Sequence, residues 1–145
     1  MGSGILVVCE HENGAPKKTA YELLSKAREL VGELGGGISA VVVGTGDAAD
    51  LGEYGASTVY TADGADFASG STGARVSALT AAIAAAQPAV VIGSACAQTR
   101  ESFPRLAARI GAGMASDCTD LKVEGGALVA RRPMYAGKAF AEVSI

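Results

Sequence analysis

The sequence predicts an α/β fold: an open, mostly parallel, Rossmann-type sheet with helices on both faces, followed by a C-terminal antiparallel β-ribbon. Apolar runs rich in branched side chains alternate with helical segments along most of the chain, an order typical of parallel strands joined by right-handed crossovers. These runs lack polar/apolar alternation, which indicates strands buried on both faces. The last quarter changes to short alternating segments around glycine-containing turns, which indicates a ribbon.

Length and composition favour one well-packed domain over residues 1–145. The net charge is -3, 49% of residues are hydrophobic and only 19% are charged, which excludes a disordered tail and a strongly basic nucleic-acid binder. With 29 Ala and 20 Gly residues and no Trp, we expect helices and strands to pack closely on small side chains.

The elements follow in chain order. We predict sheet strands at 5–9, 40–43, 58–60 and 89–92, with a fifth near 115–123. The segment 19–34 has apolar residues at helical spacing; Thr19 and Glu22 fit a capping box, and the glycines at 35–37 end the helix. Further helices are predicted at 48–54, 72–86 and 101–110, and ribbon strands on both sides of 124–126 and over 138–145.

Cysteine usage and charge place the chain in a reducing, aqueous compartment. Its three cysteines are far apart and its first residues do not form a secretory signal, so we expect a cytoplasmic protein. Residues 76–99 carry no charge and are long enough to span a bilayer. Because Pro88 divides this stretch and alanine dominates its first part, we expect no membrane insertion.

Every plausible site lies in two loops. If strands 5–9 and 89–92 are neighbours, their carboxyl ends form a crevice lined by residues 9–13 and 93–100. The candidate ligand-binding residues there are His11, Ser94 and Arg100, with Thr99 a possible cap of a helix N-terminus that favours anions. The alternative is that Thr99 only caps the helix and Arg100 lies in solvent.

Three other motifs do not indicate a functional site. Residues 44–49 spell a G-x-G-x-x-A dinucleotide fingerprint, but they follow the second strand and Asp47 would oppose a pyrophosphate, so we favour an ordinary turn with Asp47 as a cap. Cys9, His11 and Cys96 lack metal-ligand spacing, and neither Ser94 nor Cys96 lies in a nucleophile elbow. We therefore predict no catalytic residue and no metal site.

The terminal ribbon carries the candidate partner interface. It combines apolar and aromatic side chains with flanking cations, as the core and rim of an interface require. The net charge and the lack of interleaved aromatic residues argue against nucleic acid. The candidate residues are Arg132, Met134, Tyr135, Lys138 and Phe140.

These segments resemble a known family over essentially the whole chain: the N-terminal domain of the α subunit of electron transfer flavoproteins. The similar stretches are ILVVCEHENG at 5–14, YGASTVYTAD at 54–63, PRLAARIGAGMASDCTDL at 104–121 and RRPMYAGKAFAEV at 131–143. Where relatives usually have Gly-Arg-Asp, this sequence has Thr99-Arg100-Glu101, which keeps the cation and the acid but lacks the glycine and its backbone freedom.

The resemblance implies an electron carrier and not a catalyst. Family members pair α with a β subunit, accept electrons from acyl-CoA or other dehydrogenases through FAD, and pass them to a quinone oxidoreductase or another acceptor. The N-terminal domain of α has an adenine-nucleotide-hydrolase-like sheet and packs on the β subunit, whereas FAD lies mainly in a C-terminal domain. We expect that domain to be absent from a chain that is a fragment, and FAD to be bound only in the full-length complex.

Two other classes share this general sheet. A universal-stress-like regulatory domain would bind an adenine nucleotide, but it normally has a glycine-rich phosphate loop after the fourth strand, and no glycine follows Gly93 within residues 94–100. An adenylating enzyme would have a Ser-Gly-Gly-type loop after the first strand, where this chain has the acidic segment 10–12.

Overall fold

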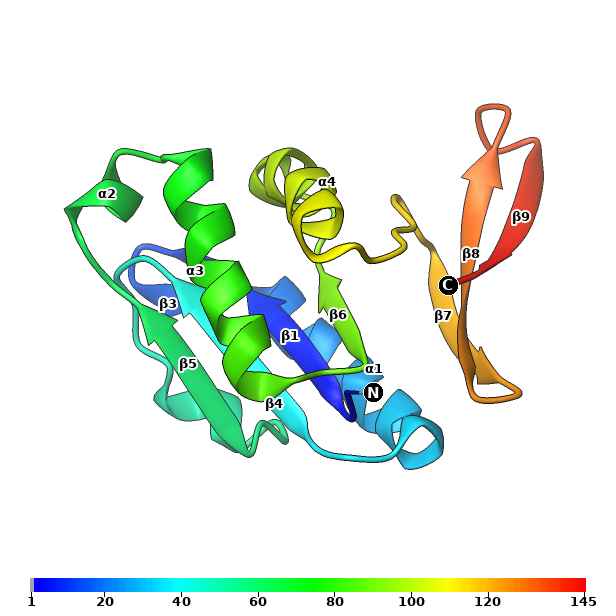
Figure 1. Cartoon of the computed structure of the whole chain (residues 1–145), viewed down its shortest axis with the longest axis horizontal. Helices are drawn as coiled ribbons and strands as arrows, with labels where there is room; N and C mark the ends of the chain where they lie inside the picture. Colours follow the sequence, from blue (N-terminus) through cyan, green and yellow to red (C-terminus); the bar gives the residue numbers. More distant parts are fainter. Residues whose placement is uncertain (1) are drawn as a thin grey trace.

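A computed structural model describes residues 2–145 and confirms the predicted fold class (Figure 1). Its main body is a parallel sheet whose strands follow the order β5-β4-β1-β6. The strands are β1 (Ile5–Cys9), β4 (Ile38–Val43), β5 (Thr58–Ala62) and β6 (Val90–Gly93). Because β1 and β6 are neighbours, the crevice expected between them lies at their carboxyl ends.

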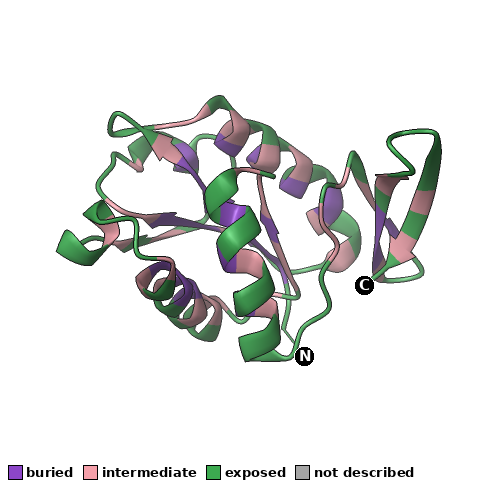
Figure 2. Ribbon diagram, turned by 90° about the horizontal axis from the view of Figure 1, so that it is seen from above, coloured by how far each residue is buried: buried purple, intermediate pink, exposed green. Residues whose placement is uncertain are grey.

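Helices cover both faces of this sheet. Helix α1 (Lys18–Leu34) packs on one face, and α3 (Thr72–Ala86) and α4 (Ala97–Ile110) on the other. Side chains of β1 alternate between the two helical layers. Ile5, Val7 and Cys9 belong to the cluster under α1. Leu6 and Val8 belong to the cluster under α3 and α4. The sheet is thus the buried centre of the molecule (Figure 2).

Helix boundaries differ from the sequence prediction mainly at N-termini. The predicted capping box at Thr19 and Glu22 is wrong: the N-cap of α1 is Lys17, and no side chain within the described residues caps it. Glu22 instead pairs with Lys18 at 3.5 Å. Helix α4 begins four residues earlier than expected, with Cys96 as its N-cap, so Thr99 lies inside the helix and is not its cap.

One shorter predicted helix also differs in detail. The helix predicted at 48–54 is the 3-10 turn η1 (Ala49–Gly52). Residues 64–74 contain the four-residue helix α2 (Ala65–Ala68) and the start of α3. A small hairpin of β2 (His11–Glu12) and β3 (Ala15–Pro16) follows β1.

The prediction of a fifth sheet strand near 115–123 is wrong. Residues 112–119, here called the strap, run from α4 toward a separate sheet formed by β7 (Asp120–Glu124), β8 (Ala127–Met134) and β9 (Ala139–Ser144) (Figure 1). The antiparallel pairing of these strands is the predicted ribbon. Short turns make such pairs between neighbours in sequence, so the alternating residues of 120–124 pair locally instead of joining the parallel sheet.

The ribbon is anchored to the main body through α1. Val123 and Leu128 are buried in the same cluster as the inner face of α1, while Lys26 on α1 contacts Asp120 at 3.1 Å. The charge-free stretch 76–99 forms most of α3, then β6 and the start of α4. No helix within residues 2–145 is long and apolar enough to cross a membrane.

Candidate functional site

The crevice at the carboxyl ends of β1 and β6 is closed by a buried ion pair. Glu10 comes directly after β1 and forms a salt bridge with Arg75 of α3, and the two side chains are 6% and 11% exposed. The hydroxyl of Thr99 in α4 donates to the same Glu10 oxygen at 3.4 Å. Three elements far apart in sequence therefore meet at the place where this fold class usually holds a ligand.

The Glu10 carboxylate takes the place that a bound anion would occupy at the start of α4. The first turn of α4 has free backbone N–H groups that favour negative charge, and the Glu10 carboxylate lies beside that turn through Thr99. An incoming phosphate would meet that carboxylate and the Arg75 guanidinium already paired with it. The geometry therefore disfavours phosphate binding at this crevice.

His11 is directed away from β6 and toward the loop after β4. Its Nε2 donates to the Asp47 carbonyl oxygen at 2.7 Å, whereas its buried Nδ1 has no partner among the described residues. A Cβ at Gly46 would overlap the His11 ring. The second glycine of the G-x-G-x-x-A segment thus makes room for His11, and Asp47 accepts from the Ala49 N–H at 2.9 Å, as expected for an ordinary capped turn.

Ser94 and Arg100 border a groove beside β6, which also reaches Thr99 and the carboxyl end of that strand. The Arg100 guanidinium donates to the Asp117 carboxylate of the strap at 2.9 Å, and both side chains are more than half exposed. The three candidate ligand residues therefore do not form one site: Ser94 and Arg100 border the groove, and His11 contacts the Gly46–Asp47 turn.

The three cysteines have different environments. Burial raises the pKa of the Cys9 thiol to about 12, and the negative charge of Glu10 adds to this effect. Burial also acts to raise the pKa of Cys96, but hydrogen bonds from Thr99 and Ser94 outweigh it and leave that pKa below the ordinary value. Burial raises the pKa of Cys118. Within residues 2–145, no group of three or more His, Cys, Asp or Glu side chains is placed to hold a metal ion.

These environments predict an order of thiol reactivity. In a series of iodoacetamide labelling rates at increasing pH, Cys96 should react at the lowest pH, Cys118 at higher pH and Cys9 only on unfolding, because the thiolate is the nucleophile. The Thr99 hydroxyl lies 3.3 Å from the Cys96 sulfur, so Thr99→Val should move the Cys96 labelling midpoint to higher pH. The control Thr80→Val, which removes a hydroxyl bonded to Val76, should leave it unchanged, and equal midpoints in all three proteins would refute the assignment.

The ribbon places the candidate interface residues on two faces and a turn. Residues that face each other across a ladder share a face of the sheet. Phe140 pairs with Pro133 and lies 4.3 Å beneath the Arg131 guanidinium, whereas Met134 and the half-buried Arg132 alternate onto the other face. Tyr135 and Lys138 lie in the turn between β8 and β9.

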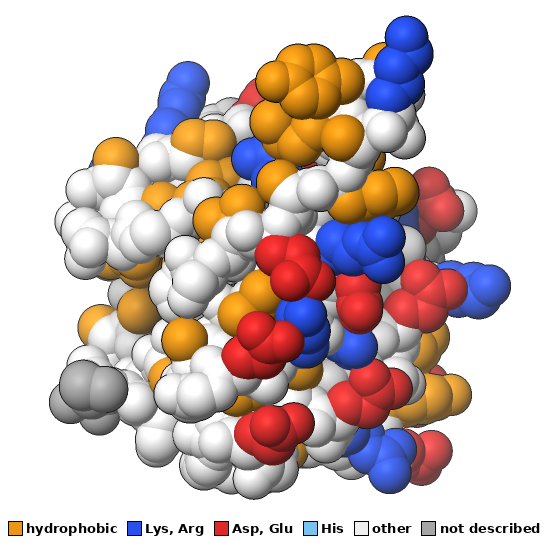
Figure 3. Space-filling model, turned by 90° about the vertical axis from the view of Figure 1, so that its right-hand side faces the viewer, with side chains coloured by type: hydrophobic (Ala, Val, Ile, Leu, Met, Phe, Trp, Pro, Cys, Tyr) orange, Lys and Arg blue, Asp and Glu red, His pale blue; other side chains and the backbone are white. Residues whose placement is uncertain are grey.

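The ribbon side carries exposed apolar side chains above a band of mixed charge (Figure 3). Tyr135 is 79% exposed, Phe140 52% and Met134 38%. Charged side chains of α1 and the ribbon form the pairs of Lys26 with Glu29 and Asp120 and of Lys122 with Glu124 and Glu142. Exposed aromatic residues beside cations are features of a protein interface.

Sequence reasoning missed the role of Arg75. The acidic segment 10–12 was expected after the first strand, but Arg75 was assigned no role. The helical spacing contained a signal, because Arg75 falls on the buried face of α3 with Val76, Leu79 and Ala82, and a cation on such a face needs a buried partner. Which carboxylate supplies that partner depends on the packing of β1 against α3.

Comparisons with known proteins agree on one family. The family model of the electron transfer flavoprotein domain matches residues 5–145. Among curated proteins, the chain is 33% identical to the electron transfer flavoprotein subunit alpha of Syntrophomonas wolfei over 99% of the chain and 45% of that protein. It is 31% identical to the subunit of the same name from Bacillus subtilis over 99% of the chain and 44% of that protein.

A third relative is named as a subunit of an enzyme. The chain is 31% identical over 97% of its length to the lactate dehydrogenase (NAD(+),ferredoxin) subunit LctC of Acetobacterium woodii, covering 34% of that protein. In each of these three cases the chain spans less than half the length of the curated relative it matches.

Proposed function

Because the chain belongs to the electron transfer flavoprotein domain family, we propose that it is the scaffold and subunit-interface domain of an electron transfer flavoprotein α subunit. Together with a β subunit, such an assembly carries electrons through FAD from dehydrogenases to a quinone oxidoreductase or another acceptor. In this proposal residues 1–145 form one domain that supports electron transfer and catalyse no reaction themselves.

The observation that carries this proposal is the closure of the crevice by Glu10 and Arg75. A domain that bound a nucleotide or carried out acid-base chemistry there would need an open pocket with free donors at the carboxyl ends of β1 and β6. Here the Glu10–Arg75 pair and Thr99 fill the space beside β1, and the groove that stays open at the carboxyl end of β6 is mainly apolar. A rigid sheet with its crevice filled by its own side chains is suited to be a platform.

FAD and the electron donors belong to the proposed assembly. We place FAD mainly in polypeptide outside residues 1–145, and we expect acyl-CoA or other dehydrogenases as donors. One further relative, from Anaerotignum propionicum, is named acryloyl-CoA reductase electron transfer subunit beta and is 32% identical over 83% of the chain; this name supports a role in electron transfer beside an acyl-CoA oxidoreductase.

The proposal is tested by spectroscopy and calorimetry on the purified chain. We expect a colourless protein, because the residues that hold flavin lie elsewhere, and no heat of binding with AMP or ATP, because the crevice is closed. A yellow protein with one flavin per chain would contradict the platform role. Micromolar binding of AMP or ATP would instead favour a universal-stress-like nucleotide-binding domain.

We place the contact with the β subunit on the ribbon, at Arg132, Met134, Tyr135, Lys138 and Phe140. Phe140→Ala and Tyr135→Ala should each weaken association with the β subunit about 30-fold or more, because exposed aromatic residues at the centre of an interface commonly contribute over 2 kcal/mol. Tyr54→Ala is the matched control, since Tyr54 is 40% exposed and its ring contacts that of Tyr21 of α1 at a tilted angle, outside the ribbon. Isothermal titration measures the affinities. Equal affinities for all three variants would mean that the β subunit does not bind at the ribbon.

A further inference from the structure

The last strand of the ribbon, β9, is an exposed edge. It pairs with β8 on one side and has no strand on the other within the described residues, and it lies on the side of the ribbon away from the main body (Figure 1). The Ile145 N–H donates to the Leu128 carbonyl oxygen at 2.9 Å. Because an antiparallel ladder alternates, the backbone groups of Phe140, Glu142 and Ser144 therefore face away from β8 and are open to another strand.

The side chains next to this open edge carry opposite charges. Phe140 and Glu142 are two residues apart, so they lie on one face of the ribbon, together with Arg131 of β8. The Arg131 guanidinium is stacked over the Phe140 ring at 4.3 Å. The Glu142 carboxylate contacts Lys122 at 2.9 Å, but the Glu142 side chain is still 54% exposed. The edge thus presents a cation on an aromatic ring and, two residues further along, an anion.

A second copy of β9 matches this edge when it runs in the opposite direction. Antiparallel pairing centred on Ala141 aligns the whole strand with its counterpart and places Phe140 opposite Glu142 of the second copy. The backbone groups of both residues face outward, so the two residues form a hydrogen-bonded pair. The Arg131 guanidinium over Phe140 then meets the Glu142 carboxylate of the second copy, and the two-fold axis repeats each contact. In-register parallel pairing would instead bring the two Glu142 carboxylates together.

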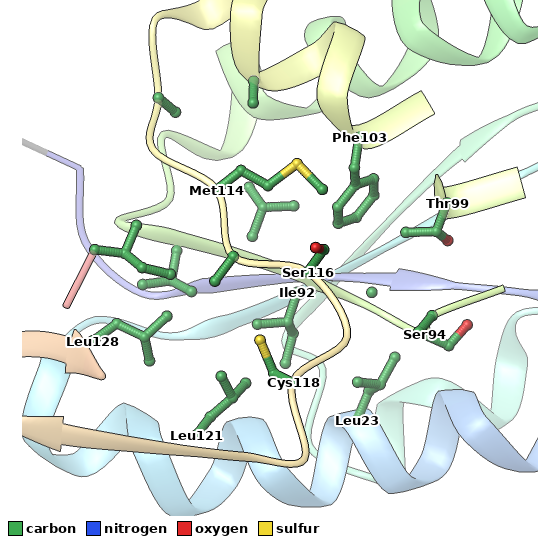
Figure 4. Close-up of a pocket in the computed structure, with 18 of the residues that line it drawn as sticks. Leu23, Ile92, Ser94, Thr99, Phe103, Met114, Ser116, Cys118, Leu121 and Leu128 are labelled. Carbon is green, nitrogen blue, oxygen red and sulfur yellow. The ribbon is translucent and has the colours of Figure 1, made fainter. Parts of the chain in front are cut away.

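The other strand edges fit a second copy less well. β6 lies inside a groove of about 720 Å³, between Leu23 of α1 and Phe103 of α4 and beside the strap (Figure 4). A strand of another folded copy would first have to displace those elements. β7 is held against α1 by the pair of Lys26 with Asp120. β5 has no charged residue, so it offers no charge pattern that selects a partner.

We propose that two copies of this chain associate through β9, which pairs antiparallel with its counterpart and joins the two three-stranded ribbons into one six-stranded sheet. Ion pairs between Arg131 of each copy and Glu142 of the other fix the direction and register of the pairing. The contact is small, so we expect an equilibrium between monomer and dimer. This inference goes beyond the proposed electron-transfer role, because it concerns the chain alone. Since Phe140 also belongs to the proposed contact with the β subunit, a second copy would compete with that subunit for the ribbon.

Reversing one charge at a time tests the pairing. Glu142→Arg and Arg131→Glu should each weaken dimerisation about tenfold or more, measured by sedimentation velocity over a range of concentrations, because each places like charges across the two-fold axis. An equimolar mixture of the two variants should dimerise as well as the original chain, because each arginine then lies opposite a glutamate of the other variant. Mixing changes no contact within a chain, so this recovery can come only from contacts between copies.

Hydrogen exchange locates the paired strand. Where about nine-tenths of the chains are dimeric, the Phe140 and Glu142 amides should exchange about tenfold more slowly than in the monomer, because exchange then requires dissociation. The edge strand β5 should not change. Glu142→Pro removes an outward N–H but no bond to β8, so it should weaken dimerisation more than the matched control Glu142→Ala, which keeps the N–H.

Three results would overturn the proposal: a chain that is monomeric at every concentration, a mixture of the charge variants that does not recover dimerisation, or slowed exchange in β6 instead of β9. None of these measurements contains the β subunit. Their failure is therefore distinguishable from a failure of the proposed function, which the titration with the β subunit tests.

Discussion

Replacing Arg75 with methionine is expected to lower the free energy of unfolding by about 3–5 kcal/mol, the usual effect of removing one partner from a buried ion pair. The methionine fills most of the space of the arginine stem but leaves Glu10 buried without its cation. Thr99 alone, at 3.4 Å, is a weak replacement. Urea denaturation of both proteins at neutral pH measures the difference.

Two further variants separate the buried pair from a general effect of losing an arginine. Arg100→Met removes the exposed pair with Asp117 and should change stability by about 1 kcal/mol or less. The double variant Arg75→Met with Glu10→Gln should be more stable than Arg75→Met alone, because it removes the unpaired charge. If Arg75→Met and Arg100→Met had the same effect, the buried ion pair would not be stabilising the crevice.

Leu24→Ala is expected to destabilise the protein by about 2–5 kcal/mol, because it removes buried methyl groups and leaves a cavity. Leu24 is 0% exposed and packs from α1 into the cluster that contains the inner residues of β1 and β4. Those strands are the centre of the sheet, so they cannot move to fill the space without disturbing both helical layers. Thermal or urea unfolding measures the loss.

The adjacent residue provides a matched control. Leu23 lies on the same helix but borders the groove beside β6, where its removal enlarges a space already present. Leu23→Ala should therefore cost only part of the transfer free energy, about 1 kcal/mol. Equal losses for Leu23→Ala and Leu24→Ala would mean that the groove is closed in solution.

Much of the fold could be predicted because its signals are local. The apolar runs at 5–9 and 40–43 became β1 and β4, and residues 72–86 became α3 with the predicted bounds. The helix predicted to end at 110 does end there, and Gly111 is its left-handed C-cap with φ 68°. The start of α1 was harder to predict. The β2–β3 hairpin, which ends at Pro16, decides where this helix begins, and Thr19 does not.

The sequence predicted where the candidate site lies but not which side chains come together there. The loops after β1 and β6 do lie together, as expected from parallel strands, but His11 does not join Ser94 and Arg100. His11 instead packs against Gly46, which comes from the loop after β4. That contact depends on how the β2–β3 hairpin folds over the sheet, and spacing in the sequence contains no information on it.

The sequence by itself determined the alternation of strands and helices, the small-residue packing and the family, because side-chain branching, periodicity and glycine positions act over a few residues. Only the tertiary structure decided that Glu10 pairs with Arg75, 65 residues away, and with Thr99, 89 residues away. It also decided that no fifth parallel strand forms near 115–123, which leaves β6 at the edge of the sheet within the described residues. Such outcomes depend on which surfaces bury one another, a competition among distant segments that is settled only when the whole chain packs.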